Sequence, residues 1–160
     1  DDSGSQKITP RDLIAGFTAG VTDISGAISS RSIKIKMVNR QGEAKALVHE
    51  TCHFYVSDAF RNAVQARKDG EELIGGAMIR KMLFEGFAEH FAEEVMQANP
   101  QFGPYFQTYE NEVEQVWRIV QTLGEDSLRK AYFKGDTAET KKLMKTVDGY
   151  KKISPDLLIP

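Results

Sequence analysis

The chain has 160 residues, of which 41% are hydrophobic and 28% are charged, the composition of one soluble globular domain that is long enough to bury a core. Its 21 basic and 23 acidic side chains give a formal net charge of −2, so there is no electrostatic reason to expect nucleic acid or an anionic membrane as the main partner. No apolar run approaches the roughly 20 residues that a membrane-spanning helix needs.

The chain begins with polar residues, Asp1 to Gln6, and has no initiator methionine. We therefore expect residues 1–8 to be a disordered lead and residues 9–160 to be a single domain, either cut from a longer protein or produced by processing. A basic start followed by an apolar stretch, the pattern of a signal peptide, is absent. The single cysteine, Cys52, excludes an internal disulfide and leaves open both a reducing cytosol and a secreted or delivered domain.

The first predicted elements are a short helix and a strand. Thr9 to Gly20 opens with Thr-Pro and continues with helically spaced apolar residues, which predicts a capped helix. Residues 21–30 are rich in Gly, Ser and Thr and predict a loop. Between Ile33 and Val38, apolar residues alternate with lysines, which predicts a half-buried strand. This strand can be a plain structural edge, or it can pair with an extended peptide.

The rest of the chain predicts helices that are separated by Gly, Pro and Asn-Pro breaks. The segment Glu43 to Lys68 has no Gly or Pro and predicts one long, largely buried helix. The later predicted helices cover Glu72 to Ala98, Tyr105 to Leu123, a short stretch around Leu128 to Tyr132, and Thr137 to Val147. The sequence therefore predicts a mainly α fold of the α+β class, with a small strand element and a loosely packed tail over residues 153–160.

The strongest signal for chemistry is His49-Glu50-Thr51-Cys52-His53, an H-E-x-x-H pattern on the predicted long helix. Residues four apart lie on one helix face, so His49 and His53 can present imidazole nitrogens to one zinc ion. Glu50 would lie beside the metal without binding it, where it can take a proton from the attacking water and return it to a leaving group. The alternative is a pair of helix histidines that bind no metal.

A catalytic zinc needs a third protein ligand and one open position. Asp58 follows His53 by five residues, so it could reach the same ion only if the helix ended between them. Residues 54–66 contain no glycine that would end the helix. The better candidates are Glu85 and Glu89 on the next predicted helix.

The segment from Glu85 to Phe91, Glu-Gly-Phe-Ala-Glu-His-Phe, resembles a motif of the gluzincin metallopeptidases. In that family, H-E-x-x-H is followed on a later helix by an E-G-x-A segment whose glutamate is the third zinc ligand. The resemblance implies a zincin-like helical domain in which His49, His53 and Glu85 bind Zn²⁺ and Glu50 is the general base. Glu89 would then lie next to a ligand or in solvent.

The small size of the chain also resembles the compact metallopeptidase domains found at the ends of bacterial toxin and effector proteins. The G-x-M-E-N segment by which large aminopeptidases of the same clan bind a free amino terminus is missing. The resemblance therefore implies an endopeptidase rather than an exopeptidase.

Other residues near the motif have both a functional and a structural interpretation. His90 can orient a ligand or stabilise an oxyanion, or it can border an apolar helix face. Cys52 precedes His53 directly, so we expect it to point away from the ligands as a small buried residue. Three tyrosines can donate a hydrogen bond to an oxyanion or can be core aromatics, namely Tyr55, Tyr109 and Tyr132.

These observations lead to the hypothesis of a zinc-dependent endopeptidase that acts on a protein or peptide substrate. The alternatives are a cell-wall peptide hydrolase, which the same chemistry would serve, and a non-catalytic helical binding module that retains a metal site. The sequence gives no indication of the oligomeric state.

Overall fold

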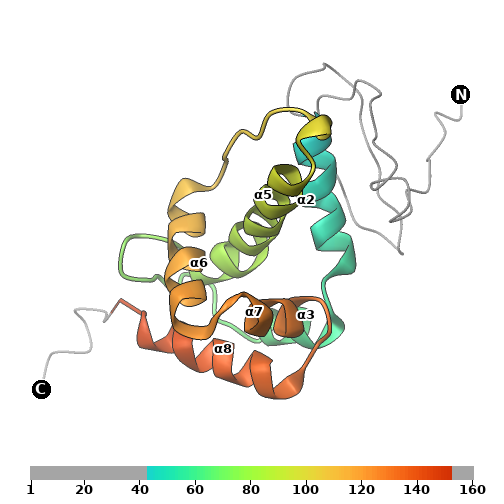
Figure 1. Ribbon diagram of the computed structural model, residues 1–160. Coiled ribbons are helices and arrows are strands. Elements are labelled where there is room, and N and C mark those ends of the chain that lie inside the picture. Colours follow the sequence, from blue (N-terminus) through green and yellow to red (C-terminus); the bar gives the residue numbers. More distant parts are fainter. Residues whose placement is uncertain (1–42, 153–160) are drawn as a thin grey trace, which may run out of the picture. The chain divides into compact units, whose positions relative to one another are not determined.

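The computed structural model describes residues 43–152, which are drawn in colour in Figure 1. This part of the chain is mainly helical and contains no sheet, with two isolated antiparallel bridges as its only β pairing. The mainly helical fold predicted from the sequence is confirmed for these residues. The predicted helix at 9–20, the predicted strand at 33–38 and the predicted tail at 153–160 lie outside the described residues.

The described residues fall into two compact units. The first contains residues 43–55 and 88–108, and the second contains residues 56–87 and 109–152. No helix in residues 43–152 is both long enough and apolar enough to cross a membrane.

The first unit is built on two helices, α2 (Glu43–Tyr55) and α5 (Phe87–Ala98), which lie side by side in Figure 1. Each helix buries an apolar stripe at helical spacing. The stripe of α2 includes Leu47, Val48 and Cys52, and that of α5 includes Ala88, Phe91, Ala92 and Met96. After α5 come Asn99, a short 3₁₀ helix η2 (Pro100–Phe102), and a segment from 103 to 108 that is neither helix nor strand.

The prediction of one continuous helix from Glu43 to Lys68 is wrong. α2 ends at Tyr55, and a separate helix α3 (Asp58–Gln65) begins after Ser57. The Ser57 backbone is extended, with φ −68° and ψ 149°, and its side chain accepts a hydrogen bond from the Phe60 amide. The Ser57 amide, in turn, donates to the carbonyl of Tyr132 at 2.7 Å. A serine cap and a distant carbonyl therefore end the helix without any glycine.

The second unit also contains α4 (Ile79–Lys81), a π-helical turn η1 (Met82–Gly86), α6 (Glu110–Leu123), α7 (Glu125–Tyr132) and α8 (Thr137–Gly149). Its core includes an aromatic cluster of Phe60, Phe87 and Tyr132, whose ring centroids are 5.0–6.0 Å apart. Tyr132 is fully buried there and stacks on Phe87. The core-aromatic interpretation of Tyr132 is therefore confirmed.

Two of the later predicted helices begin downstream of their expected positions. The helical run that was expected from Glu72 begins at Ile79, because residues 72–78 form a turn closed by the Glu72–Met78 bridge. Both glycines of this turn have positive φ values. The helix expected from Tyr105 begins at Glu110, after Tyr109 in a left-handed conformation with φ 58°. The two C-terminal helices lie close to their predicted positions: α7 begins three residues before Leu128, and α8 ends two residues after Val147.

Candidate metal centre

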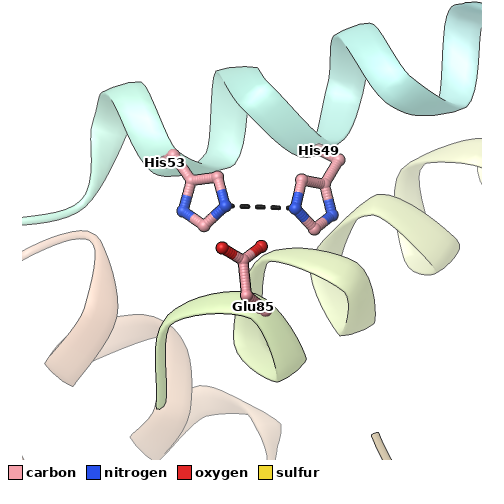
Figure 2. A group of neighbouring side chains, drawn as sticks. All are labelled: His49, His53 and Glu85. Atoms are coloured by element: carbon pink, nitrogen blue, oxygen red, sulfur yellow. Dashed lines mark hydrogen bonds between the residues drawn. The ribbon is translucent and has the colours of Figure 1, made fainter. Parts of the chain in front are cut away.

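The two motif histidines lie one turn apart on α2 and face each other. The distance between His49 Nε2 and His53 Nε2 is 3.1 Å, and the two rings meet edge to face at a centroid distance of 4.8 Å. His49 is buried and His53 is half-buried. Figure 2 shows these two nitrogens directed toward each other on the same side of the helix.

This spacing fits a shared zinc ion. Two nitrogens that each lie about 2.0–2.1 Å from a tetrahedral ion are separated by about 3.3 Å, close to the observed 3.1 Å between the two Nε2 atoms. Neutral imidazole nitrogens are also among the donors that zinc prefers. The histidine pair therefore satisfies both the donor chemistry and the donor spacing of a zinc site.

The other ring nitrogen of His49 is held by Glu89. Glu89 Oε2 lies 2.8 Å from His49 Nδ1, and the Glu89 side chain is fully buried. Burial alone would raise the pKa of Glu89, but hydrogen bonds from His49, Lys45 and the Thr108 amide outweigh it and lower the pKa to about 2. Because an ionised carboxylate only accepts, His49 Nδ1 carries the proton. In the neutral ring, Nε2 then keeps its lone pair, as a metal ligand must.

Glu85 lies on η1, the π-helical turn that continues directly into α5. Glu85 is half-buried and belongs to the second unit, whereas His49 and His53 belong to the first. π-helical turns often occur at functional sites, so the position of Glu85 on η1 is compatible with the ligand role expected from the sequence.

The remaining candidates have different surroundings. Glu50, the expected base, is half-buried on α2 directly after His49. Asp58 is exposed as the first residue of α3. Cys52 is buried, and burial raises the pKa of its thiol to about 12, so it remains a protonated small core residue, as expected. His90 is buried on α5, with its ring against Phe91 and its Nε2 3.8 Å from a Glu94 oxygen.

Two of the three tyrosines considered as oxyanion donors also have defined positions. Tyr55 ends α2 and is 39% exposed. Tyr109 precedes α6, and its ring lies 5.4 Å from the Lys81 ammonium.

Three residues that contact Glu89 were not singled out from the sequence. Lys45 Nζ lies 2.6 Å from Glu89 Oε1, and the Tyr105 hydroxyl and the Thr108 amide donate to the same oxygen. Lys45 stands four residues before His49, so helical spacing already placed it on the histidine face. Thr108 contributes a backbone group to Glu89, and no side-chain pattern could have indicated it.

Comparisons of the chain with known protein families, with curated proteins and with solved structures found no significant match.

Proposed function

We propose that this protein is a zinc-dependent endopeptidase whose metal is bound by His49, His53 and Glu85. The observation that chiefly supports the proposal is the pair of Nε2 atoms at 3.1 Å on α2, with the opposite nitrogen of His49 held by the buried Glu89 carboxylate. A core histidine pair without a metal does not need a buried carboxylate to fix the tautomer of one ring.

The proposed chemistry divides between the metal and the chain. Bound zinc would lower the pKa of a water molecule and polarise the scissile carbonyl. Glu50, next to His49, would take the proton of the attacking water and deliver it to the leaving amine. Glu89 would keep His49 in the tautomer that leaves Nε2 free of a proton. The same residues would serve the hydrolysis of a protein or of a cell-wall peptide.

Metal content tests the ligand set. We expect close to one zinc per chain, by elemental analysis, in protein purified without added metal. Glu85→Gln and His53→Ala should each lower the zinc content, because each removes one of three donors. Glu93→Gln is the matched control and should retain zinc, because Glu93 is a half-buried carboxylate on α5 that is not one of the proposed ligands. Full zinc in Glu85→Gln would overturn the assignment of that ligand.

Activity tests the role of Glu50. The wild-type protein should hydrolyse members of a fluorescence-quenched peptide library, and Glu50→Gln should lose at least about a hundredfold of that rate while retaining its zinc. Isolated cell-wall peptides form a parallel substrate set and distinguish the second substrate class. Equal hydrolysis rates in the two proteins would contradict the role of Glu50. If both proteins retain zinc and neither hydrolyses any substrate, the result would instead favour a metal-containing binding module.

A further inference from the structure

The Glu89 carboxylate has a different set of partners on each oxygen. Oε2 faces His49 Nδ1 at 2.8 Å. Oε1 accepts from Lys45 Nζ at 2.6 Å, the Thr108 amide at 2.8 Å and the Tyr105 hydroxyl at 3.0 Å. A carboxylate oxygen has two lone pairs, so three donors fill the hydrogen-bonding capacity of Oε1. The carboxylate cannot rotate away from His49 without losing several of these contacts at once.

Lys45 is a buried cation in this arrangement. The side chains of Lys45 and Glu89 are only 9% and 0% exposed, respectively. A buried carboxylate without its counter-charge is costly, because the protein interior solvates an isolated charge poorly. Lys45 also donates to Thr108 Oγ1 at 2.8 Å. The ammonium therefore joins α2, α5 and the segment that follows α5.

The segment from 103 to 108 depends on these contacts for its position. It forms neither helix nor strand, so no regular backbone pairing holds it. Tyr105 and Thr108 contact Glu89, and Thr108 also contacts Lys45. The Tyr105 ring lies 5.8 Å from the Lys45 ammonium, within cation–π range. Glu89 therefore contacts both His49 and the segment from 103 to 108.

We propose that Lys45 and Tyr105 are positioning residues of the metal centre, and that metal binding and the ordering of residues 103–108 strengthen each other. The inference rests on the proposed metal site. Lys45 and Tyr105 hold Glu89, Glu89 holds His49, and His49 Nε2 is thereby kept in place beside His53. By thermodynamic linkage, a metal that fixes His49 also favours the state in which the segment is docked.

Zinc affinity of the full chain, measured by competition with a chromophoric chelator, tests the positioning role. We expect Lys45→Met to weaken zinc binding by up to about tenfold, the lower end of the effect of removing a direct partner of a metal ligand, because Lys45 acts on His49 through Glu89. Tyr105→Phe, which keeps the ring and loses one hydrogen bond, should weaken it less. Lys45→Arg keeps the charge and should recover part of the affinity.

The control variant is Lys151→Met. Lys151 pairs with Glu71 and Asp148 at 3.2 Å in the second unit, so its loss should leave zinc affinity unchanged. Circular dichroism of each variant without zinc separates a folding defect from a loss of affinity. If Lys45→Met fails to fold, Tyr105→Phe carries the test.

Hydrogen–deuterium exchange provides the second readout. Zinc should slow amide exchange in residues 103–108 of the wild-type protein, and Tyr105→Phe should reduce that protection. Wild-type affinity in both Tyr105→Phe and Lys45→Met would overturn the positioning role and leave the metal site standing. A wild-type protein that binds no zinc would overturn both proposals, so the two failures are distinguishable.

Discussion

Two glutamates four residues apart on one helical run, Glu85 and Glu89, have different surroundings. Glu89 is fully buried, with one oxygen on His49 Nδ1 and the other used by three further donors. Glu85 is half-buried. Because the Glu89 carboxylate is already occupied by these donors, Glu85 is the glutamate that we propose as the metal ligand.

Asp148 forms ion pairs with Arg67 and Lys151. Burial raises the pKa of this carboxyl, but hydrogen bonds from Arg67 and Lys151 outweigh it and lower the pKa below its usual value. Arg67 lies 2.5 Å from Asp148, and Lys151 lies 3.2 Å from it. The folded state therefore favours the ionised form of Asp148.

This shift makes part of the stability dependent on pH. A carboxyl whose pKa is lower in the folded state stabilises the fold above its unfolded pKa of about 3.9, and that stability is lost as the pH falls through the folded value. We expect Asp148→Asn to be less stable than the wild type at pH 7, with a difference that shrinks below about pH 4. Urea denaturation at a series of pH values measures it. A difference that stayed constant down to pH 2 would contradict the assignment.

At the scale of the elements, the π-helical turn η1 packs closely on α6. Gly86 ends η1, and a Cβ atom added there would lie 3.0 Å from Glu112 Cβ and 3.1 Å from the Glu112 carbonyl carbon and oxygen. The close approach to backbone atoms leaves little room for relief. Glycine at this position lets η1, which carries Glu85, approach α6.

Gly86→Ala tests this packing, because two effects have opposite signs. Helix propensity alone would stabilise the variant by about 0.5–1 kcal/mol, whereas overpacking against α6 costs about 1–3 kcal/mol. We expect net destabilisation in chemical denaturation. Gly149→Ala, at the end of α8 with nothing within 4 Å of the added Cβ, is the control and should be neutral or slightly stabilising. Equal effects of the two substitutions would show that the contact with Glu112 is unimportant.

Helix α2 ends at Tyr55, just before Ser57. Ser57 caps α3 through the Phe60 amide and donates its own amide to Tyr132 and its hydroxyl to Ala131. The cap is a local signal of a kind that sequence can reveal, but the carbonyls of α7 come from a distant part of the chain. A prediction that rested on the absence of glycine and proline therefore extended the helix too far.

At the scale of the whole chain, metal binding should be linked to stability. A ligand that binds only the folded state at a hundred times its Kd raises the free energy of unfolding by about 2.7 kcal/mol. We expect zinc to produce a shift of this size in urea denaturation of the wild type and a much smaller one in His53→Ala. An equal shift in His53→Ala would place the zinc elsewhere, for example at His90 and Glu94 on α5, where the two side chains are 3.8 Å apart.

Spacing within a few residues was sufficient to predict the mainly helical fold, the two C-terminal helices and the common face of His49 and His53. These features depend on helical periodicity, which sequence displays directly. The start of the helical run at Ile79 was missed, because the bridge between Glu72 and Met78 outweighs the helical pattern of the residues before it.

Contacts between distant segments decided the rest. The end of α2 depends on Ser57 meeting Tyr132, and the buried pair of Lys45 and Glu89 depends on α2 lying against α5. The contact between Glu89 and His49 Nδ1 also joins two helices, and periodicity along one helix carries no information about another. Hydrogen bonds and ion pairs between segments far apart in sequence exist only once the chain is packed, and for that reason only the folded structure could supply them.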